Sequence, residues 1–160
     1  MDYELIDCKD KTKWEHAFRK LPAKWQGVFF TSNFLEIFSE KMNGLGKCFF
    51  LQDGKNIAFY PFIKTRINNI NSLKFDKEYY DIDVAPGYGG IFFSTQSENF
   101  KKEFHHKFNE YCSKESIIAQ FAKSNPLYKN EAFFEKSELN NYNIIINLEK
   151  TIDELWKNSF

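Results

Sequence analysis

The most constraining feature of the chain is a pair of β-rich runs joined by a tight-turn signal. Residues 47–52 and 56–66 are rich in aromatic and β-branched side chains, and Asp53-Gly54-Lys55 separates them. An Asp-Gly pair between two such runs is a strong local signal for a β-hairpin, because glycine readily adopts the positive φ of the turn. Pro61 lies inside the second run and lacks the N–H that a sheet ladder uses. We therefore expect an antiparallel hairpin in which Pro61 occupies an edge, a bulge or a place where the ladder parts.

Helices and further strands flank this hairpin in the sequence pattern. Asn33 with Glu36 has the spacing of an N-cap box, and Thr151 with Glu154 forms a second box. The pattern predicts an α/β (α+β) domain with a mixed, mostly antiparallel sheet flanked by helices. The expected helices cover residues 10–20, 33–42 and 97–112 and begin again at 151, and the expected strands cover 3–7, 79–84, 91–93, 116–121 and 142–148.

Length and composition favour one folded domain. The 160 residues fit a single unit, and 42% of them are hydrophobic, so there is ample apolar area to bury. The strand at 116–121 is expected to be one of the buried elements. We expect the domain to span residues 1–150 and residues 151–160 to begin a helix that leads to a missing second half. Leu155 and Trp156 of that helix are expected to face inward. An unfinished amphipathic helix also fits a partner surface, such as a homodimer formed through it.

Charge and cysteine content disfavour several classes of function. Lys plus Arg equals Asp plus Glu at 22 each, so no overall positive field attracts nucleic acid, and the basic run at 101–107 is better explained as a solvated helix face. Cys8, Cys48 and Cys112 are odd in number and far apart, which indicates small buried side chains rather than disulfides or a zinc site. With no secretory leader and no apolar run of about 18 residues, we expect a cytoplasmic protein without a membrane span.

The most informative stretch for function is the loop after the strand at 79–84. Its sequence, Pro86-Gly87-Tyr88-Gly89-Gly90, has three glycines in four positions, so its main chain can turn sharply and meet a ligand without an intervening Cβ. Asp81 and Asp83 point to one side of the preceding strand, and Tyr88 projects from the turn. A strand follows in place of a helix, which argues against a nucleotide-binding loop. The candidate binding residues are Asp81, Asp83, Tyr88, Gly87, Gly89 and Gly90, and a structural turn with a packed Tyr88 is the alternative.

The Pro86-Gly87-Tyr88-Gly89-Gly90 stretch, with an Asp in the extended run before it, resembles the "PYGYGG" stretch of Fem-type acyltransferases, which are GNAT-like. Three other segments are similar to the family in order and spacing. Residues 28–32 resemble its early F-x-S/T segment, residues 58–62 its P-hydrophobic strand, and residues 142–156 its late strand and "eelW" cap. The resemblance spans most of the chain, and its most specific part is the glycine stretch. It implies a GNAT-like arrangement of the sheet predicted above.

This resemblance implies two tandem GNAT-like halves that transfer an aminoacyl or acyl group to an amine. The present chain then corresponds to the acceptor-side half of an N-acyltransferase in cell-envelope biosynthesis, incomplete for catalysis alone. Its acceptor would be the amine of an amino sugar or a peptidoglycan precursor. The donor, acyl-CoA or aminoacyl-tRNA, would belong to the second half, so we expect no cofactor in this chain and contact with tRNA only through that half. Catalytic residues are not identified.

The chain also departs from this family in ways that keep a second function open. Where the bridge-forming branch carries an Asp linked to acceptor binding, this sequence has Gly90-Ile91-Phe92-Phe93-Ser94, so a sugar or another amine is about as good an acceptor as a lipid-linked one. No glycine-rich turn that would cradle the CoA pyrophosphate is present in the sequence. His105 and His106 are adjacent on one helix and diverge by about 100°, which does not suit a metal site. A non-catalytic recognition or oligomerisation module with the same fold is the alternative hypothesis.

Overall fold

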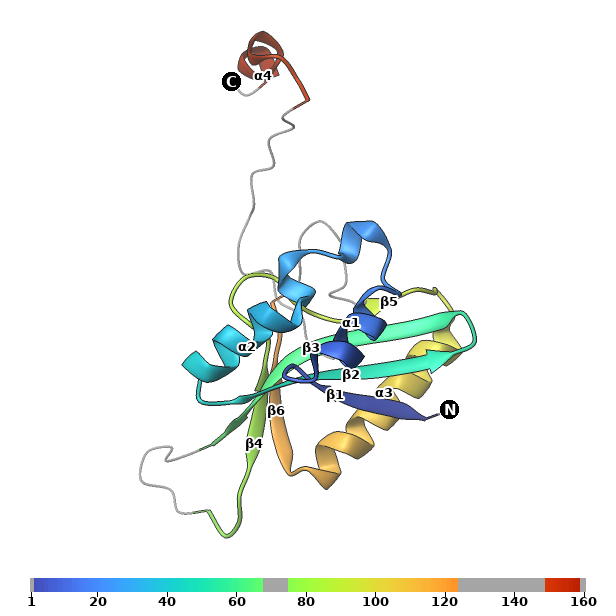
Figure 1. Ribbon diagram of the computed structural model, residues 1–160, viewed down its shortest axis with the longest axis vertical. Helices are drawn as coiled ribbons and strands as arrows, with labels where there is room; N and C mark the ends of the chain where they lie inside the picture. The colour runs from blue at the N-terminus through green and yellow to red at the C-terminus, as the bar shows by residue number, and fades with distance from the viewer. Residues whose placement is uncertain (1, 68–74, 124–148, 159–160) are drawn as a thin grey trace.

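The computed structural model describes residues 2–67, 75–123 and 149–158, and within them it has the mixed α+β fold that the sequence predicts. Six strands of this described part form one sheet in the order β1-β2-β3-β4-β6, with β5 paired to β3 (Figure 1). The pairings are antiparallel except for β4 with β6, which is parallel. The strands are β1 (Tyr3–Asp7), β2 (Leu45–Asp53), β3 (Asn56–Arg66), β4 (Tyr80–Asp83), β5 (Phe92–Phe93) and β6 (Ile117–Phe121).

Helices cover both faces of this sheet. On one face, α1 (Lys11–Phe18) and α2 (Ser32–Lys41) pack over a buried cluster that includes Trp14 and Phe59. On the other face, α3 (Glu98–Lys114) packs over a second cluster that includes Phe49 (Figure 1). The turns η1 (Ala23–Trp25) and η2 (Val28–Phe30) connect α1 to α2, and α4 (Ile152–Asn158) is the last described helix. None of the helices in the described ranges combines the length and the apolar character that a membrane crossing requires.

The predicted hairpin is confirmed as β2 and β3. Asp53 pairs with Asn56 across the turn, and Gly54 has a φ of 56°, which is the left-handed conformation that made glycine the expected residue. Alternate residues of a strand point to opposite faces. Phe50 of β2 therefore packs under α1 and α2, while Phe49 packs under α3, and the hairpin supplies both buried clusters.

Pro61 lies where the ladder on one side of β3 parts. On that side β3 pairs with β5 at Ala58–Phe59 and with β4 at Ile63–Arg66, so Pro61 falls between the two partners. On its other side β3 pairs continuously with β2, and Pro61 lies opposite Cys48. A residue without an N–H is tolerated at such a gap because no partner strand requires its donor there. This arrangement is one of the three that the sequence predicts.

The start of α2 differs from the prediction. Thr31 caps the helix, since its hydroxyl accepts a hydrogen bond from the N–H of Phe34 at 3.4 Å. Asn33 already lies inside the helix, because Thr31 is the last residue with extended backbone angles. The second box is confirmed: Thr151 Oγ1 accepts from the N–H of Glu154 at 3.3 Å, and the N–H of Thr151 donates to Glu154 Oε2 at 2.9 Å.

Two expectations about burial are wrong. β6 is a strand as predicted, but it is not buried: Ile118 is 59% and Phe121 63% exposed. The reason is position, because in the described part of the sheet β6 is the outermost strand and pairs only with β4. Trp156 of α4 is 71% exposed, whereas its neighbour Leu155 is partly buried. The strand expected at 142–148 lies outside the described residues, and the domain limit at residue 150 stays a prediction.

Candidate functional site

Asp81 and Asp83 lie on one face of β4, as the sequence predicts. Ile82 between them belongs to the buried cluster beneath α3, so the two carboxylates point to the opposite face, on which α1 and α2 pack. Asp81 is paired with Thr65 of β3, and Asp83 is paired with Ile63. Both aspartates are half-buried. The strand register therefore groups two carboxylates and one hydroxyl on the same patch of sheet.

Two buried oxygen atoms of this patch have no hydrogen-bond partner. Within the described ranges, Asp81 Oδ1 and Thr65 Oγ1 are the buried side-chain polar atoms left unsatisfied. Cross-strand neighbours have Cβ atoms about 4.5–5.5 Å apart, which is close enough for one donor group to serve both oxygens. The turn after α2 covers Thr65, because a Cβ added to Gly44 would lie 2.9 Å from Thr65 Oγ1. An unsatisfied buried oxygen costs about 1–3 kcal/mol, so this patch favours a water molecule or a ligand that donates hydrogen bonds to it.

The electrostatics of the patch favour a cation. No salt bridge of the described residues involves Asp81 or Asp83, so the two negative charges lack a counter-ion there. Burial raises the pKa of Asp83 above its ordinary value; the nearby charge of Asp81 raises it further, and the hydrogen bond from the N–H of Val84 opposes this. A carboxylate whose pKa is raised accepts a proton more readily than one at its ordinary value. The patch has the chemistry to bind an ammonium group and to take a proton from it.

An ion pair on the opposite face holds this end of β4 in place. Lys64 of β3 is buried, and its Nζ lies 2.7 Å from Glu115 Oε2 at the end of α3. The same ammonium lies 4.0 Å from the centroid of the Tyr80 ring, at the start of β4. The contact ties β3, β4 and α3 together directly behind the carboxylates. Neither Thr65 nor Lys64 is recognisable from the sequence, since both matter only through cross-strand register.

Tyr88 packs on the aromatic residues that precede α2. Its ring lies edge-on to the ring of Phe29 at 6.1 Å, and Lys123 Nζ lies 5.5 Å from its centroid. Phe29 in turn packs against the core cluster under α1 and α2. The N–H of Gly89 donates to the carbonyl of Lys123 at 3.0 Å, which anchors the loop to the chain after β6. Tyr88 is half-buried, and these contacts fit a structural turn with a packed tyrosine, while the binding role of Tyr88 stays a prediction.

The reason for glycine in this loop is packing within the domain. Gly87 and Gly90 have φ values of 118° and 108°, which side chains rarely adopt. A Cβ on Gly87 would overlap the ring of Phe29, and one on Gly89 would lie 2.7 Å from Val84 Cβ. The space where a Cβ would lie on these two glycines is thus occupied by the domain's own side chains, while Gly87 itself is exposed. Their contribution to ligand binding stays a prediction.

This packing predicts a large difference between two glycine substitutions. We expect Gly87→Ala to destabilise the protein by about 1–3 kcal/mol, because the methyl group meets Phe29 and the backbone angle is strained. Gly27→Ala is the matched control: its φ is −84° and nothing lies within 4 Å of the added Cβ, so a change within about 0.5 kcal/mol is expected. Urea denaturation measures both. Equal losses in the two variants would contradict the packing role of Gly87.

Comparison of the chain with protein-family models, with curated proteins and with solved structures finds no match. What bears on function is the geometry of the site. That geometry is a pair of half-buried carboxylates on β4, beside an unsatisfied hydroxyl on β3 and next to a tightly packed aromatic loop.

Proposed function

We propose that this chain is the acceptor-binding domain of a GNAT-like N-acyltransferase, in which Asp81 and Asp83 hold the amine that receives the acyl group. The observation that carries the proposal is the buried Oδ1 atom of Asp81, which has no partner among the described residues. An ammonium group supplies three donors and one positive charge. It therefore offers a hydrogen bond to the unpartnered oxygen and a counter-ion to the pair of carboxylates. Thr65 Oγ1, on the paired residue, is a second acceptor within the same patch.

The two carboxylates have different parts in the proposed reaction. Asp81 binds and orients the ammonium form of the acceptor. An amine attacks an acyl carbon only after losing a proton, and Asp83, with its raised pKa, is the group that accepts it. The nitrogen lone pair then forms the C–N bond while the thioester or ester bond of the donor breaks. The sulfur or oxygen leaves with the electron pair of that bond and takes up the second proton, which the nitrogen releases as the amide forms. The acyl donor in this scheme is bound outside the patch, by a second domain.

Binding of an amino sugar tests this proposal. At a D-glucosamine concentration about 100-fold above Kd, binding adds about 2.7 kcal/mol to the stability, which is a rise in Tm of about 5–10 °C for a domain of this size. D-glucose, which has the same ring without the amine, should give no shift. The Asp81→Asn variant should lose the response to glucosamine, while its own Tm without ligand stays equal or rises, because a neutral amide replaces a carboxylate whose Oδ1 is buried without a partner.

A matched control separates loss of the site from loss of any negative charge. Asp53→Asn makes the same chemical change in the exposed hairpin turn, and Asn-Gly suits that turn as well as Asp-Gly does. This variant should respond to glucosamine like the unmodified protein. A saturable glucosamine shift that persists in Asp81→Asn would remove the carboxylate from the proposal. The absence of any shift with glucosamine, lysine or other primary amines at about 10 mM would remove the acceptor site itself.

One observation favours the second candidate, a recognition or oligomerisation module. Ile152 and Trp156 are one turn apart on α4, and they are 82% and 71% exposed. Large exposed apolar side chains on one helix face are typical of interaction surfaces. Analytical ultracentrifugation discriminates between the two functions. Self-association that Trp156→Glu abolishes, together with no thermal response to amines, would support the module in place of the acceptor domain.

A further inference from the structure

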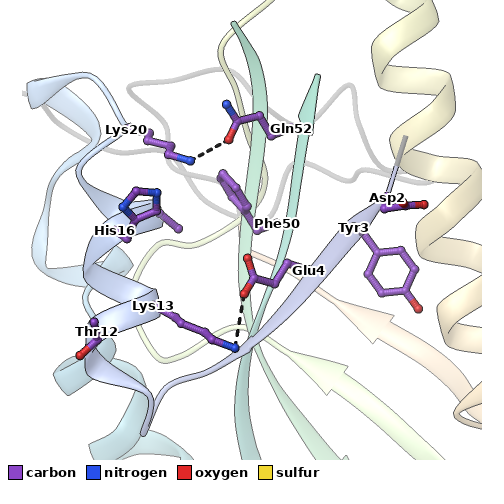
Figure 2. Close-up of a pocket in the computed structure, with 10 residues that line it drawn as sticks. Asp2, Tyr3, Glu4, Thr12, Lys13, His16, Lys20, Phe50 and Gln52 are labelled. Atoms are coloured by element: carbon purple, nitrogen blue, oxygen red, sulfur yellow. Dashed lines mark hydrogen bonds and ion pairs between the residues drawn. The ribbon is translucent and has the colours of Figure 1, made fainter. Parts of the chain in front are cut away.

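A groove lies between α1 and the β1–β2 end of the sheet, away from the carboxylates on β4. Its volume is about 580 Å³, which falls within the range of small-ligand sites of about 300–1,000 Å³. Residues of α1 form one wall, and residues from the start of β1 and from β2 form the other (Figure 2). In the sheet order β2 and β3 separate β1 from β4, so this groove and the proposed acceptor site are independent of each other.

Two polar contacts cross the groove to the sheet, one from α1 and one from the turn that follows it. Lys13 Nζ lies 3.7 Å from Glu4 Oε1, and Lys20 Nζ donates to Gln52 Oε1 at 2.7 Å (Figure 2). Lys13 and His16 are one turn apart on α1, and Lys20 lies in the turn that follows the helix. Among the described residues, the exposed His16 imidazole makes no hydrogen bond or ion pair, so its two nitrogen atoms are available to a ligand.

The floor of the groove is apolar. Phe50 lies beneath the space between the walls, and the buried Ala17 of α1 lies beside it. Lys20 Nζ is 5.2 Å from the centroid of the Phe50 ring, so the ammonium stands directly beside an apolar surface. A flat hydrocarbon body fits such a floor, with its polar group directed toward Lys20.

The charges of the two lysines are balanced differently. Lys13 is paired with the carboxylate of Glu4, whereas the partners of Lys20 in the described structure are the neutral amide of Gln52 and the ring of Phe50. Figure 2 places Asp2 on the far side of the groove from Lys20. The positive charge of Lys20 therefore lacks a carboxylate, and the neighbouring His16 adds further hydrogen-bonding capacity. A ligand with a negative group would supply Lys20 with the counter-ion that it lacks.

We propose that this groove binds a small aromatic carboxylate, with its carboxylate on Lys20 and His16 and its ring on Phe50. A carboxylate is the right size for one ammonium and one imidazole, and it forms a charge-assisted hydrogen bond with the ammonium. The ring replaces water over the part of Phe50 that stays exposed, which is 6% of the residue, and so adds a small hydrophobic contribution. Both parts of the ligand are required, because neither the single lysine nor the single ring offers a strong site alone.

Titration with phenylacetate, followed by amide chemical shifts in 15N-labelled protein, tests this site. We expect saturable shifts confined to α1 and the facing ends of β1 and β2. Phenylacetate has about ten non-hydrogen atoms, and the binding energy that a ligand of this size can reach allows a Kd of about 1 mM or below. 2-Phenylethanol carries the ring without the charge and should bind at least about fivefold more weakly. Phenylacetate shifts spread over the whole surface, or no saturation, would overturn the proposal, as would equal binding of the alcohol.

Substitutions of Lys20 identify the residue that binds the carboxylate. Lys20→Gln should weaken phenylacetate binding about tenfold, and Lys20→Arg should retain most of it. Lys102→Gln is the control, because it removes the same charge from an exposed position on α3. The Tm of each variant separates an effect on folding from one on binding. Unchanged affinity in a folded Lys20→Gln variant, or an equal loss in Lys102→Gln, would overturn the assignment.

Discussion

Replacing Trp14 by alanine is expected to cost about 3–5 kcal/mol of unfolding free energy, a large part of the about 5–15 kcal/mol that holds a typical domain together. Trp14 is 1% exposed and connects three elements of the fold. Its indole Nε1–H donates to the carbonyl of Phe30 at 3.0 Å, and its ring lies edge-on to Phe59 of β3 at 5.7 Å. The alanine variant loses the packing and also leaves the buried Phe30 carbonyl without its partner.

Two further variants check this explanation. Trp14→Phe keeps much of the apolar volume but removes the N–H donor, so its loss should fall clearly below that of Trp14→Ala. Trp156→Ala removes the same side chain from a position that is 71% exposed, and a change within about 0.5 kcal/mol is expected. Urea denaturation followed by circular dichroism measures all three. A Trp14→Ala variant as stable as Trp156→Ala would contradict the central position of Trp14 in the core.

Alkaline pH is expected to destabilise the protein strongly, through thiols that the fold keeps protonated. Burial raises the pKa of Cys48 well above the ordinary thiol value of 9.0 and raises that of Cys112 to about 11. Burial also raises the pKa of the Tyr60 hydroxyl. In the unfolded chain these thiols lose their protons as the pH passes about 9, while the folded protein retains them, so the unfolded state binds fewer protons. Stability is therefore complete below pH 9 and falls as the pH rises toward and beyond 11.

The slope of this loss can be assigned to single residues. Each fully buried thiol contributes about 1.4 kcal/mol per pH unit above its unfolded pKa. Cys48→Ala should lower stability at neutral pH through a small cavity, yet its stability should fall less steeply between about pH 9 and 11, by the amount of one proton. Urea midpoints at several pH values measure the slope. A Cys48→Ala variant with an unchanged slope would show that other groups cause the alkaline loss.

The parts of the fold that the sequence predicts are those encoded by local signals. The hairpin follows from Asp53-Gly54-Lys55, and the capping box at Thr151 follows from a side chain three residues away; both are confirmed. Local signals fail where two candidates compete. Thr31 and Asn33 are both good capping residues, and only the backbone angles of Thr31 decide between them. The parallel pairing of β4 with β6 has no local signature, because it joins residues separated by the whole of α3.

The candidate site is predictable in part for the same reason. A period of two suffices to place Asp81 and Asp83 on one side of their strand. The partner Thr65 comes from another strand, and its position beside Asp81 depends on the register of β3 with β4. The contact of Gly87 with Phe29 likewise joins segments more than fifty residues apart in the sequence. Glycine content alone indicates a close approach, but it does not tell whether a ligand or the protein's own ring makes that approach.

The hairpin of β2 and β3 links the two halves of the interior mechanically. Because neighbouring residues such as Phe49 and Phe50 enter opposite hydrophobic layers, neither layer can lose its order while the other keeps it. A substitution that loosens the packing beneath α3 is therefore expected to loosen the packing beneath α1 and α2 as well, because both layers share β2 and β3. We therefore expect the two layers to form one cooperative folding unit that melts in a single step.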